Sequence, residues 1–201
     1  MTSVEPRELT MPLLSEYEDA AEGLRGVVSH TPLEYSQHLS EVLGVPVHLK
    51  LENLQRTGSF KIRGAAYRLS RLTPEERTRG VVAASAGNHA QGVALAAQAL
   101  GIPATIFMPL GVPVPKLLAT RGYGADVILE GLIPPFNHRD IIVGQGTLGL
   151  EIVQDMPDVD TILLAVGGGG LIAGVAGAVK AMAAAAGRTV RIIGVQAENS
   201  A

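Results

Sequence analysis

Three short segments combine residue types that could do chemistry with glycines or helix starts that could hold an anion. The first ends in Ser59-Phe60-Lys61, where a polar loop gives way to a predicted helix. Lys61 would lie in the first helical turn, where the positive end of the helix dipole and partial burial beside Phe60 both lower the pKa of an amine. An amine with a lowered pKa suits Schiff-base chemistry, although the local sequence alone favours an ordinary surface lysine.

The second segment is Ser-Ala-Gly-Asn-His-Ala-Gln-Gly, from Ser85 to Gly92, between a predicted strand and a predicted helix. Free backbone N–H groups at a helix start favour an anion such as a carboxylate. Asn88 and His89 add polar side chains at the carboxyl end of the strand, where α/β proteins bind ligands. Simple helix capping by Ser85 or Asn88 is the equally good alternative.

The third segment is a run of four glycines, Gly167 to Gly170, between another predicted strand and helix. Four glycines let the backbone wrap an anion, and the following helix start stabilises a phosphate. Close packing needs fewer glycines, so phosphate binding is favoured. Gly168, Gly170 and Ala173 also match the loose pattern G-x-G-x-x-A, which leaves a nucleotide-binding oxidoreductase open.

Alternating strands and helices must position these segments. The strands are continuously apolar, which indicates burial on both faces, and repeated β–α units indicate a parallel sheet in an α/β fold. The predicted helices are 14–28, 59–72, one beginning at Pro74 after a capping box, 88–100, 115–121, 147–154 and 171–186. The predicted strands are 45–51, 81–84, 104–108, 125–129, 161–166 and 190–195.

Composition excludes several classes of protein. The chain has 201 residues, 47% of them hydrophobic and 17% charged, which excludes a disordered chain. A net charge of −3 and 3% aromatic residues argue against a nucleic-acid partner, and the absence of cysteine excludes disulfides and Cys-based sites. The histidines show no metal-type spacing, so no metal site is expected.

The stretch 161–179 has no charged residue and reaches the length of a membrane span. Its glycines would make a poor helix interior, so a strand, a turn and a new helix are expected instead, with no membrane partner. The first ten residues are polar and do not form a signal peptide. A cytoplasmic location is therefore predicted.

Taken together, the three segments closely resemble the threonine/serine dehydratase family of fold-type-II pyridoxal-phosphate enzymes, to which serine racemase is related. The resemblance rests on SFKIRGA at 59–65, SAGNHAQG at 85–92 and VGGGGLIAG at 166–174. It extends over nearly the whole chain from about Ser15, with further matches at 30–33, 119–125 and 144–147.

The resemblance implies a role for each segment. Lys61 would form the Schiff base with pyridoxal 5′-phosphate and later move the α-proton of a small amino-acid substrate. Phe60 would pack on the cofactor ring, and Asn88 would hydrogen-bond the ring 3′-oxygen. The substrate carboxylate would bind to Ser85, Ala86, Gly87, Asn88 and His89, and the phosphate to backbone N–H groups of Gly167, Gly168, Gly169, Gly170 and Leu171.

The implied reaction is dehydration and deamination of L-threonine or L-serine to 2-oxobutanoate or pyruvate plus ammonia, by a homo-oligomer. Racemases of this kind carry a serine at the position of Ala86, and alanine cannot transfer a proton, so dehydration is favoured. A serine racemase or another β-elimination enzyme is the first alternative. A non-catalytic fragment is another, because relatives are longer and supply the partner of the pyridine nitrogen beyond Ala201.

The implied architecture has two lobes with open twisted parallel sheets, as in the tryptophan synthase β subunit. We expect a large cofactor-binding lobe from 1–79 and 132–201, and a small lobe from 80–131. Relatives carry a further helix and strand near the 131/132 junction. We attribute the difference to residues omitted from the sequence at that junction.

Overall fold

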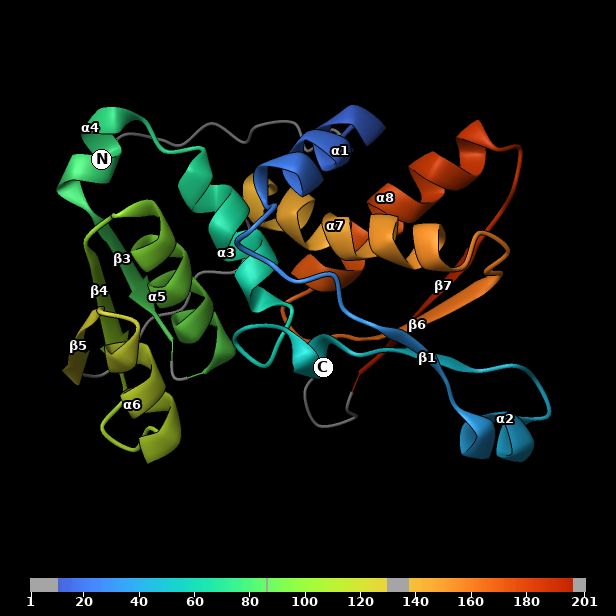
Figure 1. Ribbon diagram of the computed structural model, residues 1–201, viewed down its shortest axis with the longest axis horizontal. Helices are drawn as coiled ribbons and strands as arrows, with labels where there is room; N and C mark the ends of the chain where they lie inside the picture. Colours follow the sequence, from blue (N-terminus) through green and yellow to red (C-terminus); the bar gives the residue numbers. More distant parts are fainter. Residues whose placement is uncertain (1–10, 86, 130–137, 197–201) are drawn as a thin grey trace.

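The computed structural model describes residues 11–85, 87–129 and 138–196, and within them it forms three separate sheets with helices packed around them (Figure 1). The largest sheet has three parallel strands in the order β3-β4-β5, which are Val81–Ala84, Ala104–Met108 and Asp126–Leu129. The intervening helices are α5 (Asn88–Leu100) and α6 (Val114–Gly122). Parallel strands joined through helices confirm the predicted α/β class.

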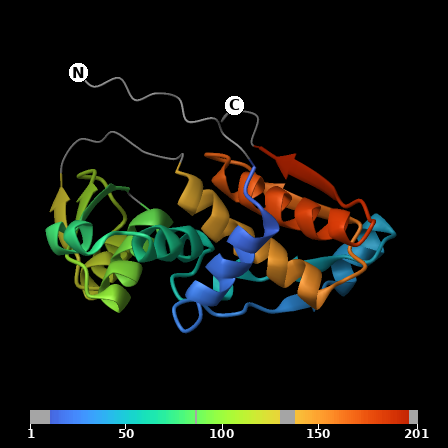
Figure 2. The same cartoon turned by 90° about the horizontal axis from the view of Figure 1, so that it is seen from above.

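A second group of elements is built on long helices. Helix α7 (Arg139–Asp155) packs against α8 (Gly170–Ala185), α3 (Lys61–Ser70) and α1 (Leu14–Gly23). Figure 2 shows α7 and α8 side by side, with α1 next to them. Strands β6 (Thr161–Ala165) and β7 (Arg191–Val195) pair in parallel and contact α8. Helix α3 lies between α7 and α5 and so joins this group to the three-stranded sheet.

A small antiparallel pair completes the described fold. Strand β1 (Leu33–Tyr35) pairs with β2 (His48–Lys50), and α2 (Gln37–Leu43) connects them. A 3-10 turn (Glu52–Leu54) then leads toward α3. The sequence predicted neither β1 nor α2, and its strand at 45–51 is reduced to three residues, because short exposed elements carry little hydrophobic periodicity.

Other predicted elements are confirmed with small changes at their ends. The strands at 81–84 and 104–108 and the helix at 88–100 have the predicted bounds. Helix α4 (Pro74–Arg79) begins with the predicted capping box, in which Thr73 Oγ1 accepts the N–H of Glu76. The helix expected at 14–28 ends at Gly23, because the chain turns at Gly26 with a φ of +78°.

The largest correction concerns α7. A helix was expected only over 147–154, but α7 starts eight residues earlier, at Arg139. Its first half contains Gly144 and Gly146, which have low helix propensity and hid the helix from sequence reasoning. A Cβ at Gly144 would lie 2.6 Å from the Cα of Gly64 in α3, so tertiary packing outweighs local propensity here.

Close glycine contacts bring the beginnings of three helices together. Gly92, in the second turn of α5, lies against the backbone of Lys61, where a Cβ would be 3.1 Å from the Lys61 carbonyl oxygen. Gly64, in α3, lies against Gly144 of α7. Gly174, in the second turn of α8, lies against the same part of α7, where a Cβ would be 2.7 Å from the backbone nitrogen of Gly146. The N-terminal turns of α3 and α8 are therefore linked through α7, and α5 packs directly on the first turn of α3.

The uncharged stretch 161–179 is divided between β6, a glycine turn and α8, as expected from its glycines. In the described residues no helix has both the length and the apolar character needed to cross a bilayer. No cluster of three or more potential metal ligands occurs among the same residues.

Candidate functional site

Lys61 is the first residue of α3, as predicted, and it is partly buried. Its ammonium nitrogen lies 5.3 Å from the centroid of the Phe60 ring, so the preceding residue forms one wall of its environment. Its backbone N–H points to the Ser59 hydroxyl at 3.4 Å. Burial lowers the pKa of Lys61, because a charged amine loses solvation there.

Lys50 and Lys180 differ from Lys61 in their partners or in their exposure. The Lys50 ammonium group donates to the carbonyl of Thr31 at 2.6 Å and forms ion pairs with Glu151 and Asp155 at 2.9 Å. Lys180 is exposed on α8. An amine becomes a nucleophile only when it is unprotonated and unpaired, and Lys61 fits this requirement better than Lys50 or Lys180.

The segment at the start of α5 has an open helix terminus. Gly87 is the N-cap residue and offers no side-chain cap, so the capping alternative for Asn88 is wrong. The Ser85 hydroxyl accepts the N–H of Gly87 at 3.2 Å, outside the helix itself. The N–H of Ala90 already donates to the Gly87 carbonyl, so the backbone N–H groups of Asn88 and His89 are the ones that face outward from the uncapped helix start and favour an anion. Ala86 was also predicted to bind the substrate carboxylate, and it lies outside the described residues.

His89 connects this segment to Lys61. Burial lowers the pKa of His89, and the positive charge of Lys61 lowers it further, so the imidazole is held in its neutral form. A neutral imidazole beside an amine can hold or pass a proton without adding a second positive charge. Asn88, the preceding residue, is exposed at the beginning of the helix.

The glycine turn before α8 is also open. Gly169 has a φ of +76° and is the N-cap of α8, with no side-chain cap. A Cβ added at Gly167, Gly169 or Gly170 would meet no atom within 4 Å, so packing does not explain these glycines. The turn leaves room for a group to approach the backbone, as the sequence predicted for a phosphate.

A buried ionic network lies behind Lys61, and sequence reasoning missed it. Arg63 is completely buried; its guanidinium donates to Glu52 Oε1 and to Glu151 Oε1, both at 2.7 Å. Burial alone would lower the pKa of Arg63, but these two carboxylates outweigh it and raise the pKa. Glu52 precedes Arg63 by 11 residues and Glu151 follows it by 88, and only the one-letter pattern SFKIRGA pointed to the arginine. Because Arg63 is two residues after Lys61, the network fixes the start of α3.

The network continues toward the surface. Burial would raise the pKa of Glu151, but hydrogen bonds and charges from Arg63 and Lys50 lower it. Lys50 also pairs with Asp155, whose carboxylate contacts His30 Nε2 at 2.8 Å. His30 belongs to one of the supporting matches, so that match has a structural place beside α7.

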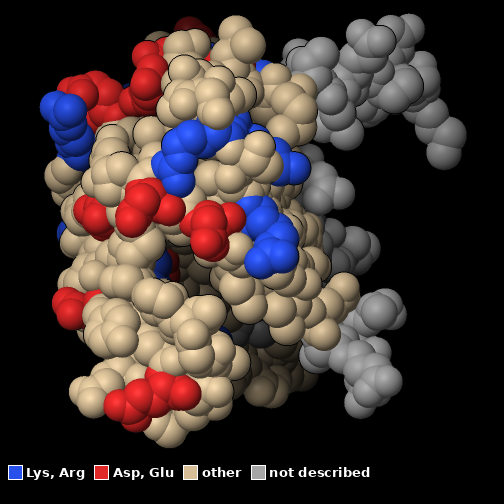
Figure 3. Space-filling model, turned by 90° about the vertical axis from the view of Figure 1, so that its right-hand side faces the viewer, with Lys and Arg blue, Asp and Glu red and all other residues tan. Residues whose placement is uncertain are grey.

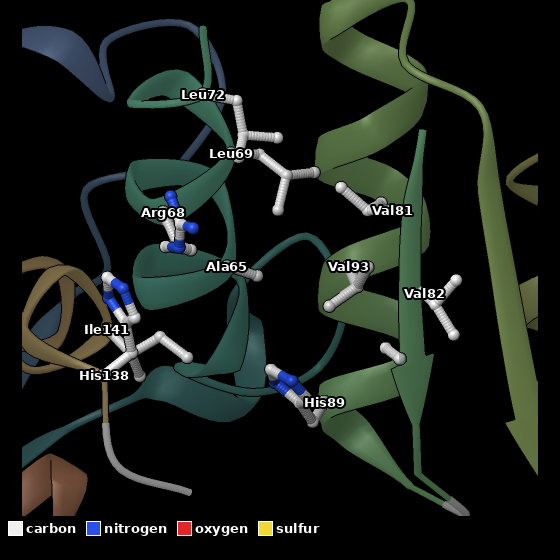
Figure 4. Close-up of a pocket in the computed structure, with 11 residues that line it drawn as sticks. Ala65, Arg68, Leu69, Leu72, Val81, Val82, His89, Val93, His138 and Ile141 are labelled. Atoms are coloured by element: carbon white, nitrogen blue, oxygen red, sulfur yellow. The ribbon is translucent and has the colours of Figure 1, made fainter. Parts of the chain in front are cut away.

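A cavity of about 270 Å³ lies beside the site, between α3, β3 and the start of α7 (Figure 4). Its walls are mainly apolar, and Arg68, His138 and His89 add polar groups. His89 extends from the start of α5 toward α3 (Figure 4). Of the predicted site residues that the structure describes, only His89 lines this cavity, so the cavity is a neighbour of the site and not the site itself.

The surface charges follow no single sign on the face shown in Figure 3, where basic and acidic side chains are interspersed. A nucleic-acid surface would gather lysine and arginine in a stripe or patch. This face therefore gives no support to a nucleic-acid partner.

Comparison with known proteins gives a family match. The family described as "Pyridoxal-phosphate dependent enzyme" matches residues 24–131 and 131–201. An L-threonine ammonia-lyase from Thermotoga maritima is 52% identical over 209 aligned positions, which cover 94% of this chain and 51% of the relative. An L-threonine dehydratase from Staphylococcus aureus is 44% identical over 92% of this chain and 59% of the relative.

Solved structures give the same answer for the fold. A threonine deaminase from Solanum lycopersicum has a TM-score of 0.85 and 41% identity, over 94% of this chain and 60% of that one. A maize serine racemase has a TM-score of 0.86 and 34% identity, over 92% and 61%. The chain thus spans about half to three-fifths of the length of these proteins.

Proposed function

Since the chain belongs to the pyridoxal-phosphate dependent enzyme family, we propose that it converts L-threonine or L-serine into 2-oxobutanoate or pyruvate and ammonia. The observation that carries the proposal is Lys61 itself, an amine whose pKa is lowered by burial and whose backbone lies against Gly92 near the uncapped start of α5. The similarity to L-threonine ammonia-lyase and L-threonine dehydratase supports the choice of reaction.

The residues present fit pyridoxal phosphate. Lys61 supplies the amine, and Phe60 supplies an apolar ring next to it. The open glycine turn from Gly167 to Gly170 and the uncapped start of α8 supply backbone N–H groups for a phosphate. Asn88, exposed at the start of α5, is free of a capping role and is assigned to the ring oxygen. When bound, the cofactor supplies an electron sink that acidifies the α-carbon of the substrate.

The chain's own residues supply binding and proton transfer. Lys61 in its neutral form accepts the α-proton, and its lowered pKa raises the neutral fraction near neutral pH. We assign the substrate carboxylate to the segment of Ser85, Ala86, Gly87, Asn88 and His89, where the uncapped α5 start favours an anion. Neutral His89 keeps a second charge away from Lys61.

Serine racemisation is the second candidate, because a maize serine racemase resembles this chain in structure. A racemase needs a proton donor on the face of the substrate opposite the lysine. Ala86 has no group that transfers protons, which favours elimination. The loose dinucleotide pattern around Gly168 lies within the stretch matched by the family, and we assign that turn to the cofactor phosphate.

We propose the same two lobes as the sequence predicts, a larger one from 1–79 and 132–201 and a smaller one from 80–131. The three-stranded sheet β3-β4-β5 and its helices fall within this range. We also propose that relatives carry extra residues near the 131/132 junction. The two family stretches meet at residue 131, and the 209 aligned positions exceed the 201 residues of this chain.

A cytoplasmic homo-oligomer is part of the proposal. Helix α8 packs against α7 and α1 within one chain, so the face that it buries there is not open to a second copy. Size-exclusion chromatography with light scattering measures the oligomeric state directly.

The test of function is keto-acid formation by the cofactor-loaded protein, compared with a Lys61→Ala variant. We expect 2-oxobutanoate from L-threonine or pyruvate from L-serine, and loss of both in the variant. D-serine production from L-serine without keto acid would instead establish the racemase. Cofactor binding without any reaction would favour the non-catalytic fragment.

A further inference from the structure

Lys116, in the first turn of α6, lies beside the start of α5. Its ammonium nitrogen is 3.4 Å from the place where a Cβ on Gly87 would stand. Gly87 is the N-cap of α5 and lies in the segment assigned to the substrate carboxylate. A cation from a different helix, outside the three sequence motifs, therefore faces this segment.

The surroundings of Lys116 favour an anionic partner. The residue is partly buried, and among the described residues no ion pair or hydrogen bond reaches its ammonium group. Lys50, in contrast, has a carbonyl and two carboxylates around its ammonium group. Lys116 also occupies the first turn of its helix, where the helix dipole disfavours a cation. An anion beside it would offset both effects.

The start of α5 favours the same kind of group. The cap of α5 provides no side-chain acceptor, so the positive end of this helix faces the same space as Lys116. The Ser85 hydroxyl accepts a hydrogen bond from the N–H of Gly87 and so fixes the conformation of the segment. Backbone N–H groups give an anion its orientation, and the lysine adds full charge, which makes such a hydrogen bond stronger.

We propose that Lys116 pairs with the α-carboxylate of the substrate and makes the site selective for amino acids over derivatives in which that carboxylate is neutralised. The inference rests on the proposed function, because it takes an amino acid as the ligand of this segment. The cofactor phosphate is the other anion in the site, so the test separates the two.

The experiment titrates cofactor-loaded wild-type protein, Lys116→Gln and Lys116→Arg with L-threonine and with L-threonine amide. Binding is read from the cofactor absorbance and, independently, from the thermal shift. Lys180→Gln, at an exposed lysine on α8, is the matched control. We expect Lys116→Gln to weaken L-threonine binding about 10-fold or more and to leave the amide within about 2-fold, since one charged hydrogen bond is lost. Lys116→Arg restores most of the binding.

Equal weakening of both ligands in Lys116→Gln would overturn the inference, because Lys116 would then only shape the segment. Weaker binding of the cofactor itself would assign Lys116 to the phosphate and would also overturn it. If the Lys116 variants show that L-threonine binding depends on Lys116 but the wild-type protein forms no keto acid, the proposed reaction is overturned and this inference stands. Wild-type protein that binds no L-threonine would overturn both.

Discussion

Gly92 and Lys61 are in contact through their backbones, in two helices that begin in different parts of the chain. A Cβ at Gly92 would lie 3.1 Å from both the carbonyl carbon and the carbonyl oxygen of Lys61. That distance is tighter than ordinary van der Waals contact, so the absence of a side chain lets α5 approach the first turn of α3. A glycine on the neighbouring helix therefore helps to place Lys61, whose amine we propose to be reactive.

Replacing Gly92 with alanine is expected to push α5 away from α3. Overpacking of this kind costs about 1–3 kcal/mol of unfolding free energy, and it displaces Lys61 from the start of α5. Chemical denaturation and keto-acid assays measure the two effects. Gly122→Ala is the control, because a Cβ there meets nothing within 4 Å. Full activity and stability in Gly92→Ala would show that the contact does not position Lys61.

Glu151→Gln tests the buried network behind the site. Hydrogen bonds from Arg63 and Lys50 outweigh burial and lower the pKa of Glu151, so its carboxylate stabilises the folded state above the unfolded pKa of about 4.5. That contribution is lost as the pH falls through the lower folded pKa. We expect a loss of about 3–5 kcal/mol at pH 7, as for other broken buried pairs.

The measurement is urea denaturation of wild type and Glu151→Gln across the acid range. The difference between them should shrink as the pH falls below 4.5. Glu18→Gln, at an exposed glutamate on α1, should match wild type throughout. A difference that stays constant with pH would mean that the charge of Glu151 contributes nothing.

Lys61 should make the unfolding free energy depend on pH on the alkaline side, below pH 10.5. Burial lowers its pKa in the folded state below the unfolded value of 10.5, so the unfolded state binds the proton more tightly. Its contribution to stability therefore rises with pH between the two values. In cofactor-free protein, Lys61→Met should be more stable than wild type at pH 7, by less than about 1 kcal/mol because the amine is partly exposed. The gain should disappear near pH 10.5, and a gain independent of pH would exclude desolvation as its cause.

Tyr17 is buried against Gly146 and Gly177, and its hydroxyl has no hydrogen-bond partner among the described residues. Tyr17→Phe removes an unsatisfied polar atom and keeps the ring. We expect unfolding free energy to be unchanged or to rise by about 1 kcal/mol, measured by thermal denaturation. A loss of more than about 1 kcal/mol would show that the hydroxyl does have a partner.

Sequence reasoning placed the helix starts of the candidate site better than the packing around them. The starts of α5 and α8 could be predicted because each follows a strand end within a few residues, and the start of α3 because it follows a polar loop. The partners of Arg63 could not, because Glu151 reaches it from 88 residues away and Glu52 from across the loop before α3. The first half of α7 was missed for a related reason. Its glycines lower local helix propensity, and their benefit lies in contacts with α3 and α8.

The most direct test of the account is to find which amine holds the cofactor. Protein loaded with pyridoxal phosphate is reduced with borohydride, which makes the attachment permanent, and the peptides are then analysed by mass spectrometry. The account predicts that the label is on Lys61. A label on Lys50, Lys116 or Lys180, or no label on protein that has bound the cofactor, would contradict it.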